Sequence, residues 1–256
     1  MIILSPSKGQ DFSPVVSPLP PTLPAFLDQT HQLITRIRQY DPPSLGSLMD
    51  ISPALAERTQ AQFQDFTLSR TAKNSKPAIL AYSGEAFRCL DAVSFLPADL
   101  DFAQQHLRIL SGLYGVVRPL DLIQPHRLEM GYALPNEKGK TLYAFWSRLI
   151  TDSLNKSMAQ ERSPMLINLA SHEYAKVVEK NRVKVPWIDI QFKEEENGQL
   201  KIVAIHAKRA RGMIAAFLIR NRVEYPEDIQ QFSSDGYRYR PELSKNRQYI
   251  FTRPMP

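Results

Sequence analysis

The segment LSGLYGVVRPLDLIQPHRLEMG, residues 110–131, decides how we interpret the rest of the chain. Within it, Gly112 and Gly115 precede two prolines, and four charged side chains are interspersed. Glycine permits backbone torsions that a side chain forbids, while proline fixes φ and removes an N–H donor. An ordinary loop between two elements does not combine so many restricted backbone positions with so many charged side chains. We therefore predict that this segment positions functional groups.

The first part of this segment has the pattern of a helix-hairpin-helix. Helical periodicity over residues 101–109 precedes it, and a Gly-hydrophobic-x-Gly turn and a hydrophobic segment follow. In a helix-hairpin-helix, backbone N–H groups of the turn hold a nucleic-acid phosphate without reading the bases. The turn here is one residue longer than the usual one. On this interpretation Gly112, Leu113 and Gly115 contact DNA.

The alternative for residues 110–131 is a structural loop whose charges neutralise one another. Arg118 would then pair with Asp121, and Arg127 with Glu129. The residues by themselves favour neither interpretation.

The composition is that of a soluble globular protein. The chain has 256 residues, of which 43% are hydrophobic and 23% are charged. A chain of this length can bury a substantial core. The single cysteine, Cys89, excludes an internal disulfide framework and a multi-cysteine zinc site. The N-terminal residues lack the pattern of a signal peptide, and no apolar run approaches the length of a membrane span. We therefore expect a cytoplasmic protein that does not associate with membranes.

The net charge of +6 is concentrated at one end of the chain. Residues 201–256 hold eleven Lys/Arg and five Asp/Glu, whereas residues 1–200 hold twenty-one of each. A concentrated basic surface attracts polyanions such as nucleic acid, although a solvated face is the commonest reason for a basic run.

Strand-like apolar runs alternate with helical periodicity, which predicts an α/β (mixed α+β) protein formed by one domain over residues 1–256. The Asn197-Gly198 dipeptide predicts a hairpin turn. The predicted strands cover residues 1–4, 77–82, 165–169, 187–193, 200–206, 237–240 and 248–253. The predicted helices cover the region from Pro24 to Pro42, a segment from Pro53, the stretch from Gly84 to 109, and residues 141–158 and 208–222.

Candidate ligand-binding residues follow two of these strands and begin one helix. Loops at strand ends are where α/β proteins hold ligands, so a lysine in the first such loop could meet an anion. A helix starting near Ser171 would offer free N–H groups to a phosphate, although Ser171 could simply cap that helix. Together with the charges of residues 110–131, the candidates are Lys8, Arg118, Arg127, Glu129, Asn168, Ser171, Glu173, Lys208 and Arg211. If they converge, they form a basic pocket that can bind a phosphate and manage a proton.

Motifs for common cofactors and catalytic classes are absent, so we predict no cofactor. Only His126 and Glu129 have a spacing that could ligate a metal on a helix, and neighbouring prolines break that helix, so we predict no metal site.

Several motifs in one order resemble the bacterial peroxide-stress protein YaaA family. Residues 110–131 carry the longest match, and further matches extend essentially from end to end. These are Ser5-Pro6-Ser7-Lys8, Leu142-Tyr143-x-Phe145-Trp146, Asn168-Leu169-Ala170-Ser171, Glu173-Tyr174, Lys208-x-Ala210-Arg211-Gly212 and Phe232-x-x-x-Gly236-Tyr237. The sequence departs from the family at Gly9, His126 and Arg209, where threonine, tyrosine and lysine are usual.

The resemblance implies a DNA-binding protein that limits oxidative damage by peroxide. It also implies a mixed α/β fold with a central mixed sheet, flanking helices, a basic cleft and a helix-hairpin-helix element. The DNA or anion contacts carried over are Lys8, Gly112, Leu113, Gly115, Arg118, Arg127, Asn168, Ser171, Lys208 and Arg211.

We therefore expect largely sequence-independent DNA binding through phosphates, and a monomer, although the sequence does not determine the oligomeric state. The alternative is an enzyme that acts on a nucleobase, nucleotide or damaged DNA site in the same pocket. Glu129 or Glu173 would then serve as acid or base, and Lys8 or Lys208 as electrophile or nucleophile. A metal-sequestering protein is the weakest interpretation, because the histidines are dispersed.

Overall fold

The computed structural model describes residues 1–15, 17–71, 73–245 and 247–255, and it shows a mixed α/β fold, as predicted. Eight strands of the described chain form one mixed sheet in the order β4-β3-β1-β6-β7-β10-β9, with β8 paired to β7. A separate pair is formed by β2 and β5. The strands are β1 (Ile2–Leu4), β2 (Lys76–Pro77), β3 (Leu107–Ser111), β4 (Gly115–Val117), β5 (Leu122–Ile123), β6 (Leu166–Leu169), β7 (Trp187–Glu196), β8 (Gln199–Lys201), β9 (Arg238–Tyr239) and β10 (Gln248–Pro254).

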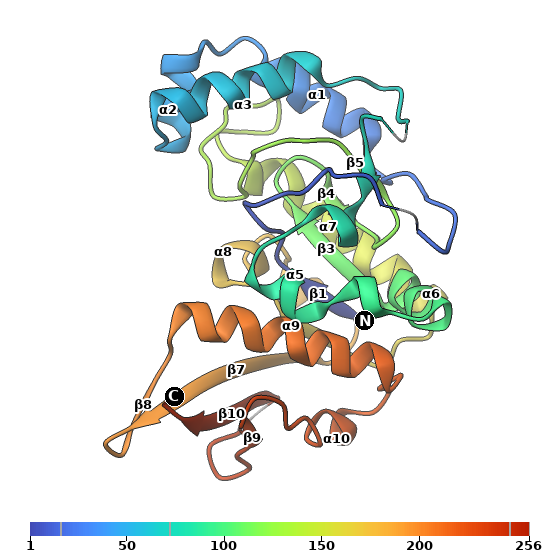
Figure 1. Ribbon diagram of the computed structural model, residues 1–256, viewed down its shortest axis with the longest axis vertical. Helices are drawn as coiled ribbons and strands as arrows, with labels where there is room; N and C mark the ends of the chain where they lie inside the picture. The colour runs from blue at the N-terminus through green and yellow to red at the C-terminus, as the bar shows by residue number, and fades with distance from the viewer. Residues whose placement is uncertain (16, 72, 246, 256) are drawn as a thin grey trace.

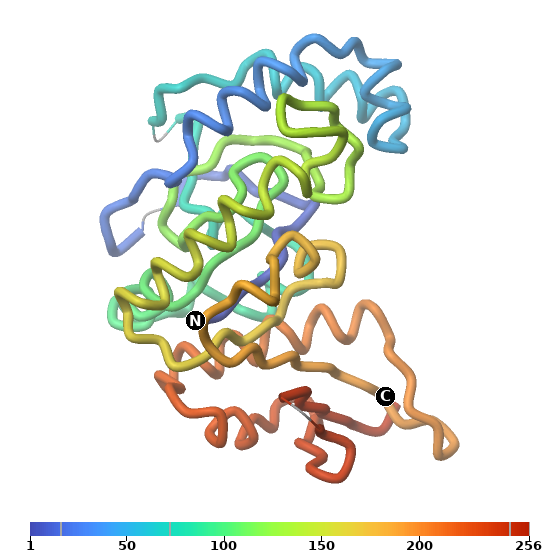
Figure 2. Tube along the Cα trace, turned by 180° about the vertical axis from the view of Figure 1, so that it is seen from behind, coloured from blue at the N-terminus to red at the C-terminus, as the bar shows by residue number. Residues whose placement is uncertain are grey.

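The helices lie at both ends of the molecule and on both faces of the sheet. In Figure 1, α1, α2 and α3 gather at one end of the long axis, while α9 lies beside β7 and β10 near the other end. Figure 2 shows α7 crossing the opposite side. The helices are α1 (Leu27–Ile37), α2 (Pro42–Met49), α3 (Pro53–Asp65), α4 (Ala78–Ala81), α5 (Glu85–Leu90), η1 (Ala92–Ser94), α6 (Pro97–His106), α7 (Leu142–Gln160), α8 (His172–Ala175), η2 (Lys180–Arg182), α9 (Ala204–Arg220) and α10 (Pro226–Ile229).

The strand β1 lies between two parallel partners that come much later in the chain. Its Ile2 is in register with Leu107 of β3 and with Ile167 of β6. All three strands therefore end at the same edge of the sheet, and β1 is the point at which the order of the strands reverses. Ligands in open α/β sheets bind outside the carboxyl ends of strands at such a point.

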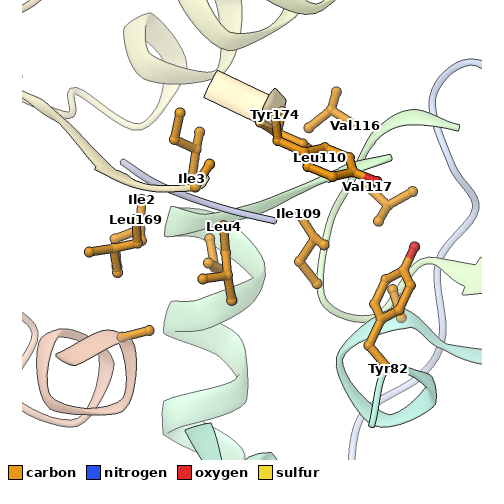
Figure 3. Close-up of a cluster of buried hydrophobic side chains, with 14 of the residues drawn as sticks. Ile2, Ile3, Leu4, Tyr82, Ile109, Leu110, Val116, Val117, Leu169 and Tyr174 are labelled. Atoms are coloured by element: carbon orange, nitrogen blue, oxygen red, sulfur yellow. The ribbon is translucent and has the colours of Figure 1, made fainter. Parts of the chain in front are cut away.

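The core is packed around these three strands. Ile3, Ile109 and Leu169 are fully or almost fully buried, and Figure 3 shows them with Tyr82 and Tyr174, which approach the strands from the segments that contain α4 and α8. The apolar runs that predicted strands 1–4 and 165–169 thus form the centre of the sheet, as expected for strands covered on both faces.

The Asn197-Gly198 hairpin is confirmed. Both residues have positive φ, of 53° and 74°, as a two-residue turn between antiparallel strands requires, and β7 and β8 pair on either side of them. The predicted second strand was too long, because β8 ends at Lys201 and α9 starts at Ala204. The predictions of helices starting at Pro53 and near Thr141 are also confirmed.

One predicted element upstream of residue 110 was wrong, and a second was too long. Residues 77–82 form the end of β2 and the one-turn helix α4, because a short apolar run is compatible with a buried helix as well as a strand. The helix predicted over residues 101–109 ends at His106, and Leu107 begins β3. The parallel pairing with β1 takes precedence over the helical periodicity there.

The helix-hairpin-helix is not confirmed, because residues 107–117 form a β-hairpin, with Gly112 and Leu113 in the turn between β3 and β4. The side chain of Leu113 is fully buried, and the Gly112 carbonyl accepts a 2.9 Å hydrogen bond from the indole of Trp146. A Cβ atom on Gly112 would lie 2.3 Å from the carbonyl oxygen of Leu128. Gly112 therefore allows the turn to pack against the backbone that precedes Glu129, and Gly115 has the positive φ of 72° that the turn needs.

Candidate functional site: a cavity at the carboxyl ends of the central strands

A cavity of about 420 Å³ lies at the shared edge where β1, β3 and β6 end. Its wall includes the loop that follows β1, the last residue of β3 and the segment that follows β6. The second half of the decisive segment, residues 126–129, closes one side, and the beginning of α5 and one face of α9 close another. The cavity therefore occupies the position that the topology of the sheet favours for a ligand.

The structure brings together seven of the nine candidate residues. Those that line the cavity are Lys8, Arg127, Glu129, Ser171, Glu173, Lys208 and Arg211. Glu85 also lines it, so four cationic and three acidic side chains face the same space. The lining is thus mixed in charge.

Arg118 does not reach the cavity. Its backbone N–H and its guanidinium both donate to the Asp121 carboxylate, with the closest contact at 2.7 Å, and Asp121 also accepts from the Thr22 hydroxyl at 2.6 Å. The structural alternative for this part of the segment, an Arg118–Asp121 pair, is therefore what the structure shows. This network links the decisive segment to the extended N-terminal region.

Asn168 also lies outside the cavity. Its amide donates to the Asp189 carboxylate at 2.9 Å, and its side-chain oxygen accepts from the Ala170 N–H at 3.0 Å. Asn168 therefore holds β6 against β7 and shapes the turn that leads to Ser171.

Ser171 acts as a helix cap, which was one of the two roles considered. Its hydroxyl accepts from the Tyr174 N–H, and its own N–H donates to the Ser5 hydroxyl at 2.8 Å. The helix that it caps, α8, has only four residues, so it offers little dipole to an anion. The serine pair instead fixes the loops after β1 and β6 beside each other.

Glu129 is the centre of a hydrogen-bonded cluster on the cavity wall. Its carboxylate contacts the Lys8 ammonium at 3.0 Å, the Tyr132 hydroxyl at 2.7 Å and the Arg127 guanidinium at 3.4 Å. The Arg127–Glu129 pair of the structural alternative is thus present as well. On the same wall, the Glu173 carboxylate accepts from the Gly131 N–H at 2.9 Å. Two of the candidate cations, Lys8 and Arg127, therefore share one carboxylate, that of Glu129, which leaves this cluster with a net charge of one positive unit.

Lys208 and Arg211 differ from the other cations because, among the described residues, neither has an ion-pair partner. They lie three residues apart on α9 and so share a face of the helix. Arg211 is half-buried, and burial lowers the pKa of its guanidinium from the ordinary value of 12.5. The neighbouring Gly212 sets this position, since a Cβ atom there would lie 1.9 Å from the carbonyl oxygen of Ala86.

Much of the remaining basic excess of residues 201–256 is neutralised within the protein. The Arg253 guanidinium is buried against Glu194 at 2.7 Å, and Arg222 contacts Asp99 at 2.9 Å. The alternation of rings and guanidiniums at residues 237–240 begins with Tyr237, which is almost fully buried and packs on Arg253. This tail therefore contributes internal ion pairs as well as surface charge.

Several uncharged side chains of the cavity were not among the nine candidate residues, although Tyr174 lies in one of the matched motifs and His126 at one of the departures from the family. They are almost fully buried and comprise Tyr82, Phe87, Ser111, His126 and Tyr174. Burial raises the pKa of the Tyr82 and Tyr174 hydroxyls, so both stay protonated at neutral pH. The pairing Glu173-Tyr174 within a motif was the one available signal, whereas Tyr82 was assigned to a strand.

His126 is neutral in this environment. Burial lowers the pKa of its imidazole to about 4, while the hydrogen bond between Nδ1 and the Gln124 carbonyl, at 2.8 Å, opposes the shift. Because a carbonyl can only accept, Nδ1 carries the proton and Nε2 is left as an acceptor. The departure from the family at this position thus places an uncharged ring beside Arg127. The other departures lie nearby: Gly9 donates its N–H to the Ser7 hydroxyl, and Arg209 lies 4.0 Å from Glu85.

We predict that His126 makes the protein sensitive to acid. Its folded-state pKa of about 4 lies below the ordinary 6.5, so between these values the unfolded chain binds a proton there that the folded protein does not. Stability should therefore fall as the pH falls through this window, by up to about 3 kcal/mol from this group. His126→Phe should flatten that part of the stability curve, measured by urea unfolding between about pH 7 and pH 4. Parallel curves for the two proteins would contradict this assignment.

Within the described ranges, no group of three or more His, Cys, Asp and Glu side chains is arranged to hold a metal ion. The helices in the same part of the chain include none that is both long and apolar enough to cross a membrane.

The fold and the cavity define an α/β protein with a cavity of mixed charge at the ends of its central parallel strands. Comparison with known proteins places it more narrowly. The profile of the peroxide stress protein YaaA family matches residues 1–243. A UPF0246 protein from Acaryochloris marina (strain MBIC 11017) is 46% identical over 253 residues, which cover 99% of each chain. A UPF0246 protein from Cellvibrio japonicus (strain Ueda107) is 44% identical over 254 residues, covering 99% of this chain and 98% of that protein.

The chain therefore belongs to the peroxide stress protein YaaA family, which confirms the resemblance carried by its motifs. Membership of this family supports a role in peroxide stress.

Proposed function

We propose that this protein acts in the cytoplasm during peroxide stress by binding DNA through its phosphates at the cavity mouth. Lys208 and Arg211 are the proposed phosphate contacts, and Lys8 and Arg127 add positive potential beside them. Phosphate contacts position a protein on DNA without reading its sequence, so the binding should be largely sequence-independent.

The observation that carries this proposal is the state of Arg211. Its side chain is half-buried in the cavity wall, and in the described chain its guanidinium has neither a carboxylate partner nor a hydrogen-bond acceptor. Burying a charge that has no partner of opposite charge raises the free energy of the folded protein. An anionic ligand would offset it, and a guanidinium matches the oxygens of a phosphate in two parallel hydrogen bonds.

We propose DNA binding and not the enzyme alternative because two of the proposed catalytic groups are already paired with each other. Lys8 and Glu129 form an ion pair at 3.0 Å, and Glu129 accepts two further hydrogen bonds. A nucleophilic lysine must have its amine free to attack a substrate, whereas the amine of Lys8 is engaged in this ion pair. Glu173 and Lys208 remain available to a ligand, so the enzyme alternative would depend on these two residues.

We predict that duplex binding weakens severalfold when the salt concentration is doubled. Each neutralised phosphate releases counterions, so the logarithm of the binding constant falls with the logarithm of salt at a slope of about −0.9 per phosphate. For the two unpaired cations alone this corresponds to roughly a three- to fourfold loss. Fluorescence anisotropy with a labelled duplex across a salt series measures the slope. Affinity that does not change with salt would contradict electrostatic binding.

A further inference from the structure

The cavity has two chemically different ends. The mouth carries Lys208 and Arg211, whereas the inner wall is formed by uncharged side chains, including Tyr82, Tyr174 and Phe87. The exposed fractions of these three side chains are 3%, 6% and 5%. The cavity therefore suits a ligand that is anionic where it meets Lys208 and Arg211 and uncharged, flat or apolar at the other end, with the carboxylates of Glu85, Glu129 and Glu173 also on the wall.

The Tyr82 hydroxyl is the clearest sign that the inner end accepts a polar group. Tyr82 lines the cavity, and its hydroxyl is shielded from solvent. The Ser111 hydroxyl lies beside it, but in the described chain the two do not have the geometry of a hydrogen bond. A buried polar atom without a partner is unfavourable and uncommon in native proteins. A ligand that hydrogen-bonds to this hydroxyl would remove the penalty.

The remaining groups at this end provide complementary hydrogen bonding. His126 has its Nδ1 proton committed to the Gln124 carbonyl, so its Nε2 can only accept. The Ser111 hydroxyl accepts from the Tyr114 N–H at 3.1 Å and lies beside the Tyr82 hydroxyl, so each of these two hydroxyls has one proton to donate. Donors and acceptors without net charge, set among aromatic rings, are what an uncharged heterocycle needs for stacking and edge recognition.

The volume agrees with a small ligand. Sites for small molecules and cofactors occupy about 300–1,000 Å³, and this cavity measures about 420 Å³. It can take one nucleotide, whereas a duplex could approach only its mouth.

We propose that the cavity binds a single nucleotide, with its base against Tyr82 and Tyr174 and its phosphate at Lys208 and Arg211. The nucleotide is either free or extruded from a DNA strand, since both sources present the same chemistry. The extruded form rests on the proposed DNA binding, and it explains why a phosphate site sits at the entrance of a deep cavity. Extrusion costs least at an unpaired or damaged position, so such positions should be the preferred targets.

The test compares three probes with the wild-type protein. They are a fully paired duplex, the same duplex with one unpaired 2-aminopurine, and adenosine monophosphate alone. We expect the unpaired position to increase affinity about tenfold, because less unstacking and unpairing is required there. The fluorescence of 2-aminopurine should change on binding, and the monophosphate should compete with the modified duplex.

Tyr82→Phe separates this inference from the proposed function. The variant loses only a hydroxyl that has no partner, so its thermal midpoint should stay the same or rise. It should bind the paired duplex as the wild type does but lose most of the tenfold preference. Tyr225→Phe is the matched control, because Tyr225 is 64% exposed and lies outside the cavity.

Each outcome has a distinct meaning. Binding to the paired duplex without preference, fluorescence change or nucleotide binding would overturn the inference and leave the proposed function standing. Binding of the monophosphate without any DNA binding, weakened by Tyr82→Phe, would support the free nucleotide as ligand and overturn the proposed function. A preference that Tyr82→Phe leaves intact would overturn the placement of the base, and failure to bind any probe would overturn both proposals.

Discussion

Replacing Lys208 and Arg211 together with alanine is expected to lower the affinity for duplex DNA by at least about 100-fold. A hydrogen bond to a charged group contributes about 1.5–3 kcal/mol, and the two contacts are the only unpaired cations that line the cavity in the described chain. The slope of affinity against salt should become shallower by about two, one for each lost phosphate contact. Anisotropy titrations of both proteins over the same salt series measure both effects.

The double variant should fold normally. Alanine is the best helix former, and the change removes a half-buried arginine side chain that has no ion-pair partner in the described chain. Lys156→Ala with Lys184→Ala is the matched control, since it removes two exposed lysines that do not line the cavity. If the control loses as much affinity as the cavity variant, binding depends on total charge and not on this site. Unchanged binding by a folded cavity variant would remove α9 from the interface.

Gly212→Ala is expected to destabilise the protein by about 3 kcal/mol or more, because its Cβ would overlap the backbone of a neighbouring helix. The clash is with the carbonyl oxygen of Ala86 at 1.9 Å and with the backbone nitrogen of Leu90 at 2.9 Å. Backbone atoms cannot rotate away as a side chain can, so α9 and α5 must separate, and overpacking of this kind costs about 1–3 kcal/mol or more. Urea denaturation of the variant and the wild type gives the difference in free energy of unfolding.

Gly46→Ala provides the control for a helical glycine without such contact. A Cβ atom there would lie 3.5 Å or more from its neighbours, and Gly46 is inside α2. The same substitution should stabilise the protein by about 0.5–1 kcal/mol, because alanine favours the helix. If Gly212→Ala behaves like Gly46→Ala, the close packing of α9 on α5 is wrong.

The parts of the fold that were predictable from the sequence are those set by neighbouring residues. Ile2 and Ile3 begin an apolar run too short for a helix, and Asn197-Gly198 suits a tight turn in any context, so β1 and the β7–β8 hairpin were predicted. Residues 77–82 were not, since an apolar run of this length is buried equally well as one helical turn. His106 ends α6 because β3 pairs with β1 a hundred residues away, and no local pattern records that pairing.

For the candidate site, too, the predictable residues were those whose position follows from the strand or loop next to them in the sequence. Lys8 and Ser171 follow strands, and the rule that ligands bind at strand ends places them together. Arg118 was assigned to the site because it is a charged residue of the segment 110–131. It instead forms an ion pair with Asp121, three residues further along the chain. Tyr82 was missed because its contribution depends on α4, which local periodicity did not reveal.

The position of β1 determines when the cavity can exist. The residues paired with Ile2 stand 105 and 165 places further along the chain, and α9, which supplies Lys208 and Arg211, follows both. Closing such long loops costs entropy before any contact compensates for it, so contacts of this range form slowly. During synthesis, a chain that has emerged only as far as β4 can form the β3–β4 hairpin and the helices that precede it but has no cavity. The binding site is therefore assembled late in folding. Any substitution that prevents α9 from docking on α5 should abolish the binding site while leaving the N-terminal helices intact.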